Sequence, residues 1–121
     1  LKLLRMGIDQ LFCLIESEQD SAKLYSELSS RLGDLVYTSN QSDVWVSLRL
    51  QGNEVPKVLE RICPIDLHSS IFTVGSVART IMDHLGTIIY HEADLDFTLM
   101  SASSSATSFL HAIEKSIENV I

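Results

Sequence analysis

The stretch V44-W-V-S-L-R-L50 decides the fold class, because its side chains alternate between two kinds. One set is entirely aliphatic, and the other is polar or much larger. This alternation has the period of two that a β-strand gives to its faces, so it predicts a strand with one face on a hydrophobic core. The aliphatic set is Val44, Val46, Leu48 and Leu50, and the other set is Trp45, Ser47 and Arg49.

The segments on either side of this strand read as further short strands and amphipathic helices, separated by glycines and polar turns. The predicted strands cover residues 2–6, 11–16, 34–39, 76–83, 87–92 and 96–101, and the predicted helices begin near Asp20, Val55 and the serine tract at 101–108. A strand followed by a helix repeats weakly, with Phe12 matching Phe97 and Leu28 matching Ile113. We therefore predict an α+β fold, an antiparallel or mixed sheet with about three helices packed on one face.

The size and composition are those of one globular domain. The chain has 121 residues, of which 45% are hydrophobic and 21% charged, which suits a single hydrophobic core. No low-complexity linker divides it, so residues 1–121 are predicted to form one domain. The net charge of −7 opposes binding to nucleic acid and to anionic membrane surfaces.

The cysteines and the N-terminal segment indicate the cellular compartment in which the protein is expected. Cys13 and Cys63 form no CxxC pair and no disulfide framework, which favours the reducing cytoplasm. Residues 1–16 are apolar but interrupted by polar residues and a glycine, and they fall short of the roughly 20 apolar residues that span a bilayer. We interpret them as two strands and a turn, not as a signal or membrane segment.

The segment from residue 63 to residue 80 contains the side chains best suited to metal binding or catalysis. Cys63, Asp66 and His68 lie close together in sequence. A zinc site needs about four ligands, usually as closely spaced pairs, and the other histidines form no HxH or HxxxH pair. A Cys–His nucleophile needs the imidazole beside the thiolate, and Pro64 keeps this stretch extended. We therefore expect no metal site and no catalytic residue here.

A structural interpretation accounts for the same residues. Cys63 suits a buried position at a helix end. Asp66 can accept backbone N–H bonds in the turn that follows the proline, and His68 can bond a carbonyl group. Phe72 is predicted to anchor the loop in the core, and Gly75 to occupy a backbone position with positive φ.

Two further positions are predicted to make polar or interface contacts. Arg79 is expected to pair with Asp66 or Asp83, or to reach a carboxylate on a partner chain. Trp45 and Arg49 share the non-aliphatic face of their strand. If that face is exposed, they are good interface anchors, since Trp and Arg dominate interface hot spots.

The sequence also resembles a known family. C63-P-I-D-L-H68, then F72, G75 and A78-R-T80, is similar to the γ subunit of heterotetrameric sarcosine oxidase, which reads C-P-L-D-L-H, a Phe, then G-x-x-A-R-T. Weaker matches extend the likeness over about residues 5–117, with Ile8 in place of a proline and Ser69 where a proline is common. The motif residues, with a predicted structural or interface role, are Cys63, Pro64, Asp66, Leu67, His68, Phe72, Gly75, Arg79 and Thr80.

The resemblance implies a fold like part of the folate-binding domain of aminomethyltransferases and a place in a complex of four different chains. Such complexes oxidatively demethylate sarcosine to glycine, release hydrogen peroxide and pass the one-carbon unit to tetrahydrofolate, giving 5,10-methylenetetrahydrofolate. FAD, FMN, NAD and the folate site are associated with the large subunits and zinc with the smallest. We therefore expect no cofactor in this chain.

The partners that the resemblance implies are the large and small subunits of sarcosine oxidase, with self-association as an option for the isolated chain. The implied role is non-catalytic, in the assembly and stability of the complex. Two alternatives stay open. One is a stand-alone folate or one-carbon ligand-binding module of the same fold, which requires a concave pocket with converging polar groups. The other is an enzyme that depends on Cys63, which requires an accessible, reactive thiol.

Overall fold

A computed structural model describes residues 2–120. Leu1 and Ile121, the two ends of the predicted domain, lie outside the described residues. Each predicted strand and helix has a counterpart except the strand at 34–39. In chain order the elements are β1 (Lys2–Arg5), β2 (Leu11–Leu14), α1 (Ser21–Leu32), the 3-10 turn η1 (Gly33–Leu35), β3 (Trp45–Gln51), α2 (Val55–Glu60), β4 (Val77–Met82), β5 (Leu85–Ala93), β6 (Asp96–Ala102), the 3-10 turn η2 (Ser103–Ser105) and α3 (Ala106–Val120).

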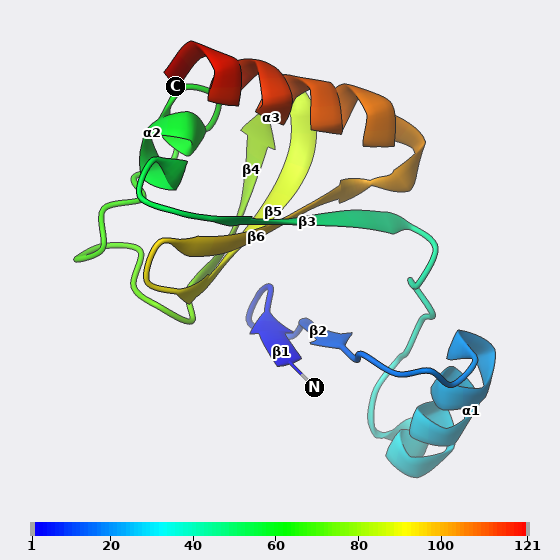
Figure 1. Cartoon of the computed structure of the whole chain (residues 1–121). Helices are drawn as coiled ribbons and strands as arrows, with labels where there is room; N and C mark the ends of the chain where they lie inside the picture. Colours follow the sequence, from blue (N-terminus) through cyan, green and yellow to red (C-terminus); the bar gives the residue numbers. More distant parts are fainter. Residues whose placement is uncertain (1, 121) are drawn as a thin grey trace.

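The central sheet has four strands in the order β3-β6-β5-β4, and each neighbouring pair is antiparallel (Figure 1). The aliphatic alternation of β3 agrees with its register, because Leu48 lies opposite Leu99 and Leu50 lies opposite Phe97 on β6. Leu99 in turn lies opposite Ile89 on β5. Side chains that lie opposite each other share a face of the sheet, so these residues form one continuous apolar surface.

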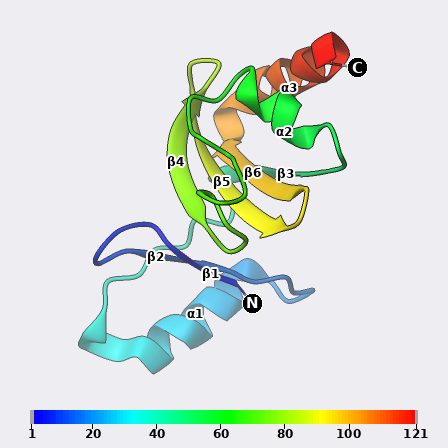
Figure 2. The same cartoon turned by 90° about the vertical axis from the view of Figure 1, so that its left-hand side faces the viewer.

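Helices α2 and α3 cover that apolar face (Figures 1 and 2). Phe109 and Ile113 of α3 are 0% and 1% exposed, and their spacing of four residues places them on one side of the helix. The Ser116 hydroxyl donates a 2.7 Å hydrogen bond to the carbonyl oxygen of Val58, which joins α3 to α2. The buried core comprises Val55, Leu59, Cys63, Leu67, Phe72, Met82, Ile89, Phe97, Leu99, Phe109 and Ile113.

The β1–β2 hairpin packs against the opposite face of the sheet, as Figure 2 shows. Leu4 is its buried anchor, at 1% exposed, and packs with Ile88 and Met100 in a second, smaller core. The ammonium group of Lys2 bonds Oε2 of Glu92 on β5 at 2.7 Å. The predicted hairpin is therefore confirmed, and it forms a layer of its own beneath the sheet.

Helix α1 forms where it was predicted but does not pack on the sheet (Figures 1 and 2). None of its residues is buried. Tyr25 ties it to the following segment by donating a 3.0 Å hydrogen bond to the carbonyl oxygen of Thr38. The α+β class is confirmed, but the placement of about three helices on one face is wrong for α1, because α2 and α3 already fill that face and polar segments lead α1 away. Within residues 2–120, no helix is long and apolar enough to cross a membrane.

The predicted strand at 34–39 is also wrong. This region begins with η1, and residues 36–44 adopt no strand. Leu35 and Tyr37 are 87% and 107% exposed. Aromatic and β-branched residues favour a strand only where a neighbouring strand can pair with them, and β1 and β2 already pair with each other. The apolar side chains of this segment therefore face outward.

Candidate functional site

Residues 63–80, which carry the predicted motif, connect α2 to β4, and we call this segment the corner (Figure 1). Cys63, Leu67 and Phe72 are each less than a tenth exposed and belong to the main core. The Cys63 backbone N–H donates a 2.9 Å bond to the carbonyl oxygen of Leu59 at the end of α2. Cys63 is thus buried at a helix end and Phe72 anchors the loop, as the sequence predicted.

The polar residues of the corner shape its first turn. Oδ1 of Asp66 accepts a 2.9 Å bond from the backbone N–H of His68, which is the turn that was predicted to follow Pro64. The His68 ring bonds no carbonyl group of residues 2–120, contrary to the prediction. Its Nδ1 accepts a 3.2 Å bond from the backbone N–H of Ser70 and lies 2.7 Å from the Ser70 hydroxyl. These contacts occupy side chains that a reactive cluster would need free.

His91 of β5 fixes the other end of the corner, a role that sequence reasoning missed. The ring is 4% exposed, and its Nδ1 donates a 2.8 Å bond to the carbonyl oxygen of Phe72. It stacks on Phe97, with the ring centroids 4.4 Å apart and the planes 6° from parallel. The His91 carbonyl oxygen accepts a 2.8 Å bond from the N–H of Gly75, whose φ of 92° confirms the predicted positive value. The sequence held one signal for this role. The period of two in a β-strand places His91 on the same face as Ile89, which is the face that points into the core.

The corner does not bring Cys63 and His68 together as a reactive pair. Cys63 is buried, whereas His68 is exposed and bonded to Ser70. Within residues 2–120, no group of three or more His, Cys, Asp or Glu side chains is placed to hold a metal ion. The arrangement is that of a structural support, in which side chains close backbone turns above an apolar floor.

Arg79 projects toward the hairpin. Its guanidinium carbon lies 5.6 Å from the centroid of the Phe12 ring, which is a cation–π distance. Among the residues from 2 to 120, the ion pairs involve other side chains, so the predicted pairs with Asp66 and Asp83 are wrong. Thr80 follows on the same strand and is half-buried. Contact between Arg79 and a carboxylate on a partner chain stays a prediction.

Trp45 and Arg49 both make contacts within the chain. Trp45 is half-buried, and its ring centroid lies 5.7 Å from that of Phe12. Arg49 binds Asp96 with two parallel hydrogen bonds, of 2.9 Å from Nε and 2.7 Å from Nη2. The face was predicted to be an interface if it is exposed, and the hairpin covers the Trp45 end of it.

These contacts set the ionisation of two carboxylates on the hairpin side of the sheet. Hydrogen bonds from the Arg49 guanidinium outweigh desolvation and lower the pKa of Asp96 to about 2. Burial alone would raise the pKa of Glu92, but hydrogen bonds from Lys2 and Thr98 hold it below its ordinary value. Both groups therefore stay ionised at neutral pH, and each is matched by a cation.

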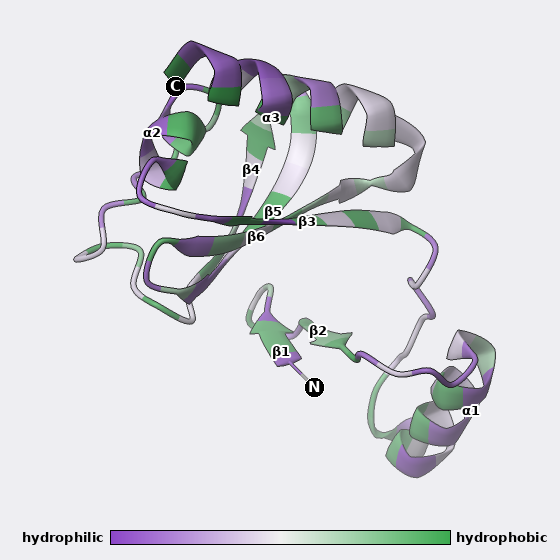
Figure 3. Ribbon diagram, viewed as in Figure 1, coloured by the Kyte–Doolittle hydropathy of each residue, from purple (hydrophilic) through white to green (hydrophobic). Residues whose placement is uncertain are grey.

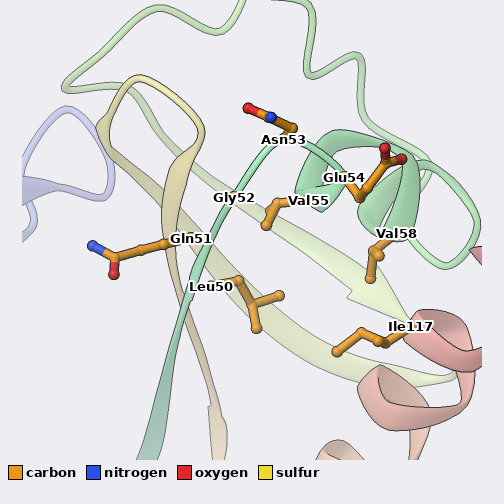
Figure 4. A pocket seen from close by; sticks show the side chains of 8 residues that line it. All are labelled: Leu50, Gln51, Gly52, Asn53, Glu54, Val55, Val58 and Ile117. Carbon is orange, nitrogen blue, oxygen red and sulfur yellow. The ribbon is translucent and has the colours of Figure 1, made fainter. Parts of the chain in front are cut away.

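Two of the hollows on the surface formed by residues 2–120 bear on function. One, of about 270 Å³, lies between the end of β3, the start of α2 and the last turns of α3 (Figure 4). Figure 4 shows Leu50, Val58 and Ile117 turned toward the same space, so it offers mainly apolar contacts. The other, of about 570 Å³, lies at Trp45 and Arg79 beside the β4–β5 turn and has a more polar lining.

Known proteins resemble this chain in sequence and in fold. No protein-family model matches it. The sarcosine oxidase subunit gamma of Corynebacterium sp. (strain P-1) is 25% identical over 114 residues, an alignment that covers 90% of this chain and 53% of that protein. A chain of the heterotetrameric sarcosine oxidase from Corynebacterium sp. U-96, solved in complex with pyrrole 2-carboxylate, superimposes with a TM-score of 0.85 at 21% identity, covering 98% of this chain and 60% of that chain.

The chain thus spans about half the length of the curated relative that it matches. The structural match confirms the α+β fold, including the hairpin and the separate helix, because it covers nearly all of this chain. The corner motif and the sequence relative point to the same kind of subunit. This chain is therefore similar in sequence to a sarcosine oxidase subunit gamma and shares the fold of a chain of a heterotetrameric sarcosine oxidase.

Proposed function

We propose that this chain is a non-catalytic γ-type subunit that docks on the other subunits of a heterotetrameric sarcosine oxidase and stabilises the assembly. The relationship to a sarcosine oxidase subunit gamma supports the type of complex. The corner supports the non-catalytic role, since its cysteine is buried and its polar side chains close turns. We further propose that the other subunits hold the flavins, the nicotinamide dinucleotide, the folate site and the zinc.

The observation that carries the proposal is the apolar surface of the N-terminal third. Helix α1 has an apolar stripe but no buried residue, and Leu28 and Leu32 of that stripe are 36% and 41% exposed. Figure 3 shows apolar positions on the hairpin and on α1, at a distance from the main core. An amphipathic helix with no core beneath it gains little from its own chain, so its apolar face is suited to contact with another protein.

The outer face of the hairpin and the segment after α1 extend this surface. Leu3 and Leu11 lie on the side of the hairpin that faces away from the sheet, at 63% and 62% exposed. Leu35 and Tyr37 follow α1 and are almost wholly exposed. We call the set comprising Leu3, Leu11, Leu28, Leu32, Leu35 and Tyr37 the N-terminal surface. Exposed apolar side chains in such number are typical of a protein that functions within a complex.

Co-purification tests the proposal. The full chain is co-expressed with the large subunits, and the complex is isolated through a tag on one of them. We expect the wild-type chain to be retained, and the double variant Leu11→Ser/Leu35→Ser to be lost. The control is Leu110→Ser, a substitution on the outer side of α3 at a residue 44% exposed, which should be retained.

The results separate a general failure from a misplaced interface. If the wild-type chain never accompanies the large subunits, the assignment as a subunit is wrong. If the wild-type chain is retained and the double variant is retained equally well, the N-terminal surface is not the interface. The absorbance spectrum of the isolated chain is a second readout, since a flavin bound by this chain itself would contradict the division of cofactors between subunits.

A further inference from the structure

The larger hollow, which we call the Arg79 cleft, has a structural cause in the sheet itself. It lies at the end of the sheet near the β4–β5 turn. The register places Gly86 opposite Ile81, and Ala102 opposite Trp45. One strand pair therefore contributes a glycine and an alanine side by side, flanked by the much larger Ile81 and Trp45. Gly86, Ala102 and Trp45 all line the space of about 570 Å³, and the two small residues leave room beside the Trp45 ring.

The lining of the Arg79 cleft carries hydrogen-bond donors and no acid. Arg79, His84, Thr80 and Ser105 contribute polar groups, as do Thr87 and Ser101, whose hydroxyls donate to backbone carbonyls. Among residues 2–120, no Asp or Glu lines the cleft. This lining is unusual in a chain that carries 16 acidic residues against 9 Lys and Arg. Asp83 adjoins His84 in the turn but is not part of the lining. The local charge of the cleft therefore opposes the acidic charge of the whole chain.

Arg79 is held in place without its hydrogen-bonding capacity being used. Its guanidinium lies over the Phe12 ring, with 5.6 Å from the guanidinium carbon to the ring centroid. Among residues 2–120, its N–H groups donate to no side chain and to no carbonyl oxygen, and it joins no ion pair. An arginine fixed by an aromatic ring with its planar donor edge free is suited to bind a carboxylate through two parallel bonds.

The elements next to Arg79 also favour a negatively charged ligand. Asp83 and His84 have φ values of 48° and 70°, which is the left-handed pair of a two-residue hairpin turn, and this turn sets His84 at the cleft. Ser105 directly precedes α3, whose N-terminal end carries the positive end of the helix dipole. Ile88 and Leu85 supply an apolar wall. A ligand that fits combines a negative head group with a short aliphatic part.

We propose that the Arg79 cleft binds a carboxylate group, with Arg79 as its principal partner. The carboxylate belongs either to a small organic acid or to an Asp or Glu side chain of a partner protein. Both sources share the same chemistry at the guanidinium. The proposal stands independently of the subunit assignment, because it rests on the lining of this cleft alone.

The single tryptophan of the chain makes the proposal directly testable, since Trp45 is a wall of the cleft. The full chain is titrated with propionate, and the Trp45 fluorescence and indole N–H resonance are recorded. Propionamide, the uncharged analogue, is the matched control ligand. In a second arm the capped tripeptide Ala-Glu-Ala is compared with Ala-Gln-Ala. We expect a saturable change with at least one of the two carboxylates and none with either amide.

Two variants test the role of Arg79. Arg79→Gln should weaken carboxylate binding by on the order of tenfold or more, because a charge-assisted pair is lost. Arg31→Gln, which removes an exposed arginine of α1 instead, should bind as the wild type does. Arg79→Lys, which keeps the charge but not the planar donor edge, should bind at an intermediate strength.

The two arms also identify the source of the carboxylate. Saturation by propionate supports a small organic acid, whereas saturation by the Glu peptide alone supports a side chain of a partner. The proposal is overturned if neither carboxylate saturates, if the amides give the same response, or if folded Arg79→Gln, judged by an unchanged circular dichroism spectrum, binds as well as the wild type.

Discussion

Replacing Leu4 with Ala tests the central claim about the hairpin, namely that one leucine anchors it to the back of the sheet. Leu4 is 1% exposed and packs with Ile88 and Met100. Leu→Ala removes about three buried carbon groups at roughly 0.8 kcal/mol each, which gives about 2.4 kcal/mol before any cavity term. Leu→Ala substitutions in rigid cores cost about 2–5 kcal/mol. We expect a value near the lower end, about 2–3 kcal/mol.

We expect a loss of stability near the lower end of this range because the hairpin can move away from the sheet instead of leaving a cavity beneath it. A two-stranded hairpin is marginal by itself, so it can detach from the sheet once its anchor is shortened. Detachment replaces the cavity by solvent and limits the loss of stability. The Lys2–Glu92 pair and the Phe12–Trp45 contact oppose this detachment.

The matched control is Leu3→Ala, in the neighbouring residue of the same strand. Leu3 is 63% exposed on the outer side of the hairpin, so its truncation should change the free energy of unfolding by about 0.5 kcal/mol or less. Urea unfolding followed by Trp45 fluorescence gives the free energies, and hydrogen exchange of the β1 and β2 amides reports detachment. Equal losses in the two variants, or unchanged protection of the hairpin amides in Leu4→Ala, would refute this account.

Two other predictions concern ionisation and thiol reactivity. Because the pKa of Asp96 is lowered from 3.8 to about 2, its contribution to stability is complete above pH 3.8 and is lost as the pH falls toward 2. Urea midpoints measured between neutral pH and pH 2 should therefore fall more steeply for the wild type than for Asp96→Asn, and parallel curves would show that the Arg49–Asp96 pair does not set this dependence. With a thiol-specific chromogenic reagent, exposed Cys13 should react rapidly and buried Cys63 only on unfolding. Rapid labelling of Cys63 in the Cys13→Ser variant would revive the hypothesis of a Cys63-dependent enzyme.

Local patterns in the sequence were sufficient to predict most elements. The alternation of residues 44–50 identified β3, and the spacing of Phe109 and Ile113 identified the buried side of α3. Cys63, Phe72 and Gly75 were assigned their structural roles from residue type and from the neighbouring proline. In each of these cases the determining interactions lie within a few residues or depend on burial alone.

Positions that depend on distant contacts were not predictable in this way. The strand–helix repeat matched α1 with α3, but periodicity indicates that a helix has an apolar side and not which surface covers it. Arg79 lies over Phe12 because the hairpin folds beneath the sheet. The sequence near Arg79 contains no pattern that predicts this position of the hairpin. His91 is fixed by Phe72 and Phe97, so its role follows from the assembled corner and not from its own segment.

The contact between His91 and the corner also constrains the order in which the chain can become structured. The closing hydrogen bond joins Phe72 to a residue 19 positions further along the chain. During synthesis, a nascent chain that has not yet emerged as far as His91 can form the first turn of the corner but lacks the hydrogen bond that fixes its Phe72 end. Hairpins such as β4–β5 form within about 1–10 μs, so the corner closes almost as soon as this strand becomes available. The interval before that point is when the growing chain exposes the motif side chains to chaperones.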